Sequence, residues 1–248
     1  MSNVFNPCLV IPCYNHAQLL AGIIERLESY GLPIIIVDDG SHATDAETLN
    51  RLTHNHNNRH LLTLPENQGK GGAVIAGFKI AYAQGFTHAL QIDADGQHDM
   101  EDIPKFLKLS EQNPDALISG VPIYNDSVPK SRLYSRYITH FWVWVETLSF
   151  SIIDSMCGFR VYPLKETISL INKEKIGCYM DFDIEVMVKL YWRNVPVLFI
   201  KTNVDYPETG LSNFRVFQDN ARISWMHTRL FFGMLIRSPM LIWRKCVK

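Results

Sequence analysis

The sequence predicts an α/β protein with a mostly parallel central sheet and helices on both faces of that sheet. In the first half of the chain, short continuous apolar segments alternate with stretches of helical periodicity. Apolar strands that alternate with helices are typical of a parallel sheet buried on both faces. Polar clusters also follow several apolar segments directly, and such sheets bind ligands beyond the carboxyl ends of their strands.

The expected elements follow one another along the chain. Strands are expected where apolar runs lie between polar clusters, at residues 9–11, 34–37, 60–64, 89–92, 116–118 and 195–200. Helices are expected where the apolar spacing is helical, at residues 17–30, after residue 41, and at residues 72–84, 134–153, 181–191 and 220–243. We expect one domain over residues 1–248, with a regular first half to residue 125 and a less regular second half from residue 126.

The composition excludes several classes of protein. The 24 basic and 25 acidic residues are nearly balanced, so no bulk positive field gathers nucleic acid, and we expect no nucleic-acid partner. The five cysteines form no C-x-x-C pair, which argues against a zinc site or a disulfide framework and favours a reducing, cytoplasmic compartment. The sequence shows neither a signal-peptide pattern nor an apolar run of about 18 residues, so no membrane span is expected.

The segment from Asp93 to Gln97 is the first candidate site. If the chain leaves its strand extended, residues two apart point to the same side, so that Asp93, Asp95 and Gln97 converge. Their oxygens are hard ligands that suit Mg²⁺ or Mn²⁺, and a metal there would stabilise a departing diphosphate. The alternative is an acidic turn that ends a strand.

Two further polar clusters follow the same layout. In the first, Asp38 and Asp39 end a buried strand, and one carboxylate is suited to accept hydrogen bonds from a base or ribose; an Asx turn is the alternative. In the second, a glycine-rich stretch at residues 67–72 precedes a helix. There Lys70 is placed to meet a phosphate, although the stretch is not a P-loop, and a plain flexible loop is the alternative.

Together these segments carry a resemblance to a known family. The segments V-I-P-C-Y-N at residues 10–15, I-I-V-D-D-G-S at 35–41, N-Q-G-K-G at 67–71 and D-A-D-G-Q-H at 93–98 occur in order. They resemble the successive motifs of the family-2 glycosyltransferases with the GT-A fold. The branch that the chain resembles most is the dolichyl-phosphate mannose synthase-like, or polyprenyl-phosphate sugar synthase, enzymes, and the match covers roughly residues 9–160.

The resemblance implies a function and a set of site residues. It implies an inverting, metal-dependent transferase that moves a sugar from a UDP- or GDP-sugar to a polyprenyl or other lipid phosphate, using Mg²⁺ or Mn²⁺. The implied nucleotide-sugar ligands are Pro12, Tyr14, Asn15, Asp39, Lys70 and Asp93, and the implied metal ligands are Asp93, Asp95 and Gln97. The implied catalytic residues are Asp95, Asp154, Arg132 and Arg136. In this division, residues 1–125 bind the donor and residues 126–248 the acceptor.

The second half matches the branch less closely. Arg132 and Arg136 lie four apart, so on a helix they form either an anion clamp or a solvated basic face. The segment that begins at Asp154 resembles the D-x-x-S-G-F-R motif of the family, with Cys157 in place of serine. His16 stands where glutamate is usual, and Glu208 puts a negative charge where the branch carries a positive one. These departures leave open a hydroxyl acceptor, with Asp154 as its general base.

Two acidic and aromatic stretches have open interpretations. Asp181, Asp183 and Glu185 alternate with apolar residues; Glu185 is suited to anchor a helix near the site, whereas the first two are equally well explained as capping or surface charges. The aromatic and basic tract at residues 225–237 is either an interfacial helix or a core helix. As an interfacial helix it would hold the protein peripherally at the inner face of a membrane.

Two other classes of protein compete with the transferase. A sugar-1-phosphate nucleotidyltransferase would need a glycine-rich loop with arginine directly after the first strand, where this chain has P-C-Y-N at residues 12–15. A non-catalytic protein that binds nucleotide sugars is the second competitor. The intact trio of Asp93, Asp95 and Gln97 argues against it.

Overall fold

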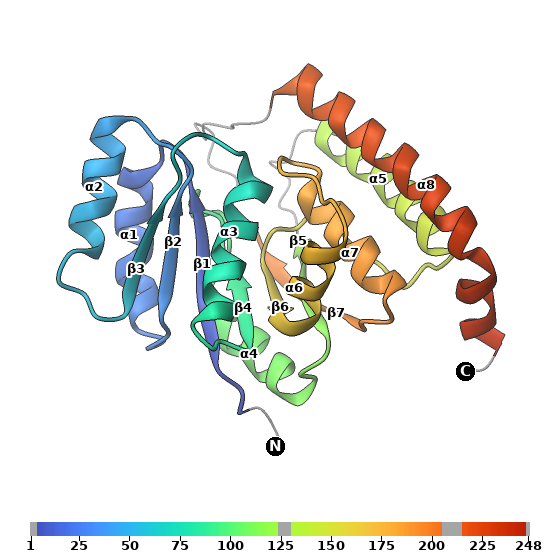
Figure 1. Ribbon diagram of the computed structural model, residues 1–248, viewed down its shortest axis with the longest axis horizontal. Helices are drawn as coiled ribbons and strands as arrows, with labels where there is room; N and C mark the ends of the chain where they lie inside the picture. Colours follow the sequence, from blue (N-terminus) through green and yellow to red (C-terminus); the bar gives the residue numbers. More distant parts are fainter. Residues whose placement is uncertain (1–3, 124–129, 205–214, 247–248) are drawn as a thin grey trace.

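The computed structural model of the chain describes residues 4–123, 130–204 and 215–246, and it leaves the side chains of residues 130–135 outside that description. The described residues form one seven-stranded sheet with the strand order β3-β2-β1-β4-β6-β5-β7 (Figure 1). The strands are β1 (Pro7–Cys13), β2 (Ile34–Asp38), β3 (Arg59–Thr63), β4 (His88–Gln91), β5 (Leu117–Ile123), β6 (Arg160–Pro163) and β7 (Val197–Asn203). Neighbouring strands are parallel, except that β6 runs antiparallel to both β4 and β5.

The predicted α/β class and mostly parallel sheet are confirmed. Each expected strand is present within a few residues of its predicted position, but β6 was not predicted. This strand has four residues and begins with the fully buried Arg160, so it lacks the apolar run that marks the other strands. Its insertion joins β4, from the first half of the chain, to β5 and β7 in the same sheet.

Helices cover both faces of the sheet. They are α1 (Ala17–Glu28), α2 (Ala43–Thr53), α3 (Lys70–Ala83), α4 (Ile103–Gln112), α5 (Lys130–Thr147), α6 (Leu164–Lys173), α7 (Phe182–Trp192) and α8 (Val216–Cys246), and a short 3₁₀ helix η1 (Met100–Asp102) precedes α4. Alternate residues of β1 supply the two hydrophobic cores: Leu9 and Ile11 pack with α1 and α4, and Cys8 and Val10 pack with α3, α6 and α7.

The sequence did not indicate α4 and α6. Both helices are amphipathic and short, and each buries only a few apolar side chains, such as Ile103 and Phe106 in α4. Helix α4 begins after a turn in which the Asp99 side chain accepts a hydrogen bond from the Glu101 amide. That cap is local, but the apolar face of α4 becomes recognisable only against the sheet that it covers.

Helices α5 and α8 lie side by side at one end of the molecule, next to α7 (Figure 1). One face of α8 buries Met226, Leu230, Met234 and Leu241. The opposite face exposes large apolar side chains, so the core-helix interpretation of residues 225–237 holds for one face only. Within the described part of the chain, none of the helices combines the length and apolar character needed to cross a bilayer.

Candidate active site

The predicted nucleotide residues lie where β1 and β2 end. Pro12 is buried in β1 opposite Val37, and the Asp39 amide donates to the Cys13 carbonyl at 2.9 Å. The Asp39 carboxylate accepts a hydrogen bond of 2.7 Å from the Gln68 amide, in the loop that precedes α3. Asp39 therefore joins the ends of β1 and β2 to the glycine-rich loop.

Burial dominates the electrostatics of Asp39. The residue is 2% exposed, and burial raises the pKa of its carboxyl to about 6, although the amides of Gln68 and Gly69 lower it. The nearby charge of Asp38 raises the pKa further. A carboxylate with a raised pKa is a strong hydrogen-bond acceptor at neutral pH, which suits a ribose hydroxyl or a base N–H group.

Tyr14 and Asn15 form the turn after β1. Asn15 has a φ of 55°, and its amide donates to the Ser41 hydroxyl at 3.0 Å. Its side-chain carbonyl accepts a hydrogen bond from the His42 amide at 2.9 Å. Asn15 thereby connects the loops after β1 and β2, while Tyr14 is half-buried with its ring 6.5 Å from that of His42.

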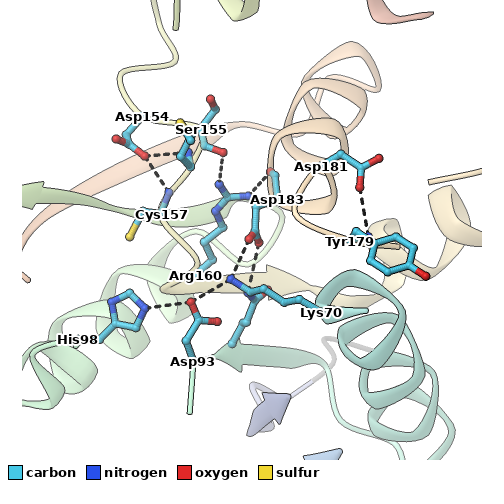
Figure 2. Close-up of polar contacts among 12 residues, drawn as sticks. Lys70, Asp93, His98, Asp154, Ser155, Cys157, Arg160, Tyr179, Asp181 and Asp183 are labelled. Carbon is cyan, nitrogen blue, oxygen red and sulfur yellow. Dashed lines mark hydrogen bonds and ion pairs between the residues drawn. The ribbon is translucent and has the colours of Figure 1, made fainter. Parts of the chain in front are cut away.

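Lys70 lies between two carboxylates (Figure 2). Its ammonium is 2.9 Å from Oδ2 of Asp93, at the end of β4, and 3.0 Å from Oδ2 of Asp183, in α7. His98 Nε2 lies 3.5 Å from the same Asp93 oxygen, and the His98 ring stacks on Phe159. Burial alone would raise the pKa of Asp93, but the charges of Lys70 and His98 outweigh it and hold that pKa below its ordinary range.

The acidic segment after β4 fits a divalent cation. Oδ1 of Asp93 is buried and has no hydrogen-bond partner among the described residues. The pKa of Asp95 is raised by burial and, to a smaller extent, by the charge of Asp93, so the two carboxylates interact electrostatically. Oδ1 of Asp95 accepts only a 3.1 Å hydrogen bond from the Gln97 amide among the bonds described there.

These carboxylates do not complete a metal site by themselves. Within the described ranges, no group of three or more His, Cys, Asp and Glu side chains could hold a metal ion. The remaining ligands would have to come from the Gln97 amide oxygen, water or a diphosphate. A partly protein-built site of this kind is usual for Mg²⁺, which keeps waters and phosphate oxygens among its ligands.

The glycines beside Lys70 allow the start of α3 to pack closely against residues 178–182. A Cβ on Gly69 would collide with the Tyr179 ring and the Cys178 carbonyl, and a Cβ on Gly71 would collide with Phe182. The Gly72 amide also donates to the Cys178 carbonyl at 2.9 Å. Close packing against the start of α7 accounts for glycine at positions 69 and 71.

Asp154 and Arg136 form a bidentate ion pair. Arg136 Nε and Nη2 donate to the two carboxylate oxygens of Asp154 at 2.7 and 2.9 Å. The amides of Met156 and Cys157 also donate to Asp154 Oδ1, and His140 Nε2 lies 3.5 Å from Oδ2. Burial would raise the pKa of Asp154, but His140 and Arg136 hold it below its ordinary range. The predicted residue Arg132 lies in α5, and its side chain is outside the described residues.

Gly158 brings the two halves of the chain together. A Cβ at this position would lie 2.7 Å from both Oδ2 of Asp93 and Nζ of Lys70. The segment that contains Asp154 therefore passes directly against the Lys70–Asp93 pair, as Figure 2 shows. The segment predicted to bind the acceptor therefore runs beside two residues predicted to bind the donor.

The sequence did not assign several residues to this site. Asp183 is buried, at 5% exposure, which corrects its interpretation as a capping or surface charge. Arg160 is fully buried and donates to the carbonyls of Ser155 and Asp183. The alternation of acidic and apolar residues around Asp183 was visible, but only the tertiary contact with Lys70 distinguishes it from a surface charge.

A mostly parallel sheet with polar side chains beyond the ends of β1, β2 and β4, and carboxylates among them after β2 and β4, is the arrangement of an α/β enzyme that binds a nucleotide-containing ligand. The chain belongs to glycosyl transferase family 2, whose family model matches residues 8–179. It is therefore a glycosyltransferase, and its fold is the GT-A fold predicted from the motifs.

Curated relatives agree with the branch that the motifs resemble. The chain is 24% identical over 249 residues to a dolichyl-phosphate beta-glucosyltransferase of Dictyostelium discoideum, covering 92% of this chain and 74% of that protein. It is 26% identical over 233 residues to the polyprenol monophosphomannose synthase of Mycolicibacterium smegmatis, covering 84% and 82% of the two chains.

Solved structures share the fold. A glucosyl-3-phosphoglycerate synthase from Mycobacterium tuberculosis, in complex with Mn²⁺, UDP-glucose and phosphoglyceric acid, has a TM-score of 0.65 at 11% identity and covers 94% of this chain and 80% of its own. A mannosyltransferase from Pyrobaculum calidifontis, in complex with GDP-mannose and Mn²⁺, has a TM-score of 0.59 at 15% identity, with coverages of 94% and 64%.

Proposed function

We propose that the protein transfers a sugar, with inversion, from a UDP- or GDP-sugar to a polyprenyl-type lipid phosphate, and that it requires Mg²⁺ or Mn²⁺. The observation that carries this proposal is the pair of acidic residues, Asp93 and Asp95, in the segment that follows β4. There Asp93 presents a buried oxygen with no hydrogen-bond partner among the described residues, beside Asp95 with its raised pKa. The Mn²⁺ and sugar-nucleotide complexes of the two solved neighbours support the choice of ligands.

Each donor-site residue has a distinct task in this proposal. Asp39 accepts hydrogen bonds from the nucleoside, and Pro12, Tyr14 and Asn15 shape the pocket at the ends of β1 and β2. Asp93, Asp95 and Gln97 hold the metal, which when bound supplies counter-charge to the leaving diphosphate. Lys70 acts on the donor through Asp93, because its ammonium is engaged by Asp93 and Asp183.

The environment of Asp154 favours a phosphate acceptor over a hydroxyl acceptor. A hydroxyl acceptor needs a general base, and a useful base has a pKa near the working pH. The pKa of Asp154 is held low instead, and both of its oxygens accept hydrogen bonds. A phosphate monoester with a second pKa of about 6 is already mostly ionised at pH 7 and needs no base. The names of the relatives support the same choice.

Arg136 is the described basic residue that best suits the acceptor phosphate. Its guanidinium is oriented by two hydrogen bonds to Asp154 and remains 16% exposed. A cation held in place in this way can attract a phosphate without losing its orientation. Arg132, one turn earlier in α5, would be the second member of the clamp.

A turnover assay tests the proposal. UDP- and GDP-sugars are incubated with a short polyprenyl phosphate and Mn²⁺ or Mg²⁺, and the anomeric configuration of the product is read by NMR. We expect one donor to give a product with inverted configuration. We expect EDTA and the variant Asp95→Asn to abolish transfer, and Glu111→Gln, at an exposed position of α4, to leave it unchanged.

The same mixture distinguishes the acceptors. With a phosphate acceptor, Arg136→Ala raises the acceptor KM steeply while Asp154→Asn retains turnover once it is folded. A nearly inactive Asp154→Asn with a mild Arg136→Ala would instead identify a hydroxyl acceptor. No transfer to any lipid phosphate by the unmutated enzyme would refute the proposed acceptor.

The exposed face of α8 supports a peripheral position at the cytoplasmic face of a membrane. Trp225, Phe232, Ile236 and Trp243 are 63%, 60%, 80% and 65% exposed, and their spacing of seven, four and seven residues puts them on one stripe of the helix. The adjacent helix α5 exposes Tyr137, Ile138 and Phe141. An apolar face of this size beside a site for a lipid phosphate is suited to dock at the bilayer interface.

A further inference from the structure

We propose that Asp183 is a positioning residue of the donor site, which holds the Lys70 ammonium between two carboxylates so that Asp93 stays oriented toward the donor. This inference rests on the donor site proposed above. It concerns how the charged side chains of that site are held in position, and it assigns a role to a buried carboxylate that the proposed reaction does not otherwise use.

Asp93, Lys70 and Asp183 form a charge triad, in which the Lys70 ammonium contacts both carboxylates. The ammonium lies 2.9 Å from one carboxylate and 3.0 Å from the other, and the side chains of Lys70 and Asp183 are 18% and 8% exposed (Figure 2). With one positive and two negative charges, the triad has a net charge of −1. If Asp183 were neutral, the Lys70 ammonium would pair with Asp93 alone and would offset more of the Asp93 charge that faces a bound cation.

Asp183 is held by the core and Asp93 is turned to the site. Oδ1 of Asp183 accepts a hydrogen bond of 3.2 Å from Gln91 Nε2 in β4, and its backbone carbonyl accepts from Arg160. Because Oδ2 of Asp183 contacts the Lys70 ammonium, both of its carboxylate oxygens are used inside the protein. Asp93 keeps one oxygen with no hydrogen-bond partner among the described residues, which is the oxygen available to a metal or donor.

The surroundings confine the ammonium between the two carboxylates. Gly158 passes so close that a Cβ would lie 2.7 Å from Nζ of Lys70. On its other side, the Asp93 oxygen is flanked by His98. Lys70 is also the first residue of α3, so its backbone is fixed by the helix. The position of the Lys70 ammonium thus depends on the two carboxylates. The contact with Asp183 determines how strongly the ammonium interacts with Asp93.

A double-mutant cycle tests this role. The variants are Asp183→Asn, Lys70→Met and the combination of both, and the matched control is Asp181→Asn. Asp181 is a buried carboxylate at the start of the same helix, but it accepts a hydrogen bond from the Tyr179 amide instead. Affinity for the nucleoside diphosphate with Mn²⁺ is measured by isothermal titration, donor KM and kcat by steady-state kinetics, and folding by thermal unfolding.

We expect Asp183→Asn to weaken nucleotide–Mn²⁺ binding and raise donor KM by about tenfold, within the range for coupled neighbouring charges, and to change kcat less than about threefold. In the Lys70→Met background, Asp183→Asn should cause no further loss of affinity and should raise the melting temperature, because it removes repulsion from Asp93. Asp183→Glu, which keeps the charge, should restore most of the affinity and provides a folded variant if Asp183→Asn unfolds.

Several results would overturn the inference. These are an equal loss of affinity in Asp183→Asn and Asp181→Asn, or additive effects of the Lys70 and Asp183 changes. A collapse of kcat with unchanged KM in Asp183→Asn would also refute a positioning role, because it indicates a group that acts on the reacting atoms. If the wild-type protein binds no sugar nucleotide at all, the proposed function fails and this inference fails with it.

Discussion

At the scale of the residue, the raised pKa of Asp39 gives the donor site a measurable pH dependence. The carboxyl of the free protein titrates at about 6, so it is ionised at pH 7 and mostly protonated at pH 5. Only the ionised form accepts two hydrogen bonds from the nucleoside. We therefore expect the dissociation constant of the nucleoside diphosphate to rise about tenfold between pH 7 and pH 5, measured by isothermal titration.

The variant Asp39→Asn provides the control for this prediction. It should bind the nucleotide more weakly at pH 7, and its affinity should lose the part of the pH dependence that comes from residue 39. This comparison also removes the titration of the ligand phosphate, which both proteins share. An identical pH profile in the two proteins would place the nucleoside away from Asp39.

The pKa of Asp154 is shifted downward, in contrast to that of Asp39, and this shift affects the stability of the fold. Its pKa is held below the ordinary value, so its ionised form stabilises the fold above about pH 4, and this contribution is lost as the pH falls further. We expect Asp154→Asn to lower the free energy of unfolding by about 3 kcal/mol at pH 7, because it removes the buried carboxylate that accepts two hydrogen bonds from Arg136. Urea denaturation measures the difference, which should shrink below pH 4. An unchanged midpoint at pH 7 would contradict it.

At the scale of the element, α3 is placed by close contact with the start of α7. Gly71 leaves no room for a side chain against Phe182, whereas Gly22 in α1 has no atom within 4 Å of a Cβ built on it. We expect Gly71→Ala to destabilise the protein by about 1–3 kcal/mol through overpacking. Gly22→Ala should stabilise it by about 0.5–1 kcal/mol, because alanine is the better helix former.

Chemical denaturation of the two alanine variants makes this comparison directly. Both substitutions add the same methyl group to a helix, so helix propensity alone would shift both midpoints upward. Opposite signs show that the contact between α3 and α7 controls position 71. Equal stabilisation of both variants would show that α3 has room to move away from α7. Lys70, the first residue of α3, would then move with the helix.

At the scale of the whole molecule, helices α5 and α8 form an exposed apolar face at one end of the fold (Figure 1). Truncating α8 is a poor test of membrane binding, because it would also remove Met226, Leu230 and Met234 from the core. We expect the triple variant Trp225→Ser, Phe232→Ser and Ile236→Ser to lose at least about a hundredfold in partitioning to vesicles that contain anionic lipid, since each side chain contributes about 1.5–3 kcal/mol on burial.

Co-sedimentation with liposomes measures this partitioning. The matched control is the double variant Leu19→Ser and Tyr82→Ser, which removes exposed apolar side chains from α1 and α3, away from α8. It should sediment like the wild-type protein. Equal loss in both variants would indicate nonspecific adhesion, and no loss in the triple variant would remove α8 from the interface.

The sequence by itself determined the class of fold, and it placed acidic residues at the strand ends where we propose that the donor binds. Apolar runs such as residues 34–37 mark buried strands through local composition alone, and the acidic residues that follow them are near in sequence to the strands that place them. The order of the motifs then identified the family, and Asp39, Asp93 and Asp95 lie where the strand ends predicted them. Each of these conclusions depends on residues within one strand and the turn after it.

Only the tertiary structure decided which charges meet. Lys70 and Asp183 come into contact because β6 inserts antiparallel between β4 and β5 and brings α7 against α3, and no local pattern encodes that strand order. The same holds for the pairing of Arg136 with Asp154, and for the face of α8 that packs inward. The reason is physical: strand and turn preferences act over a few neighbouring residues, whereas buried ion pairs form between distant segments that the hydrophobic core has already brought together.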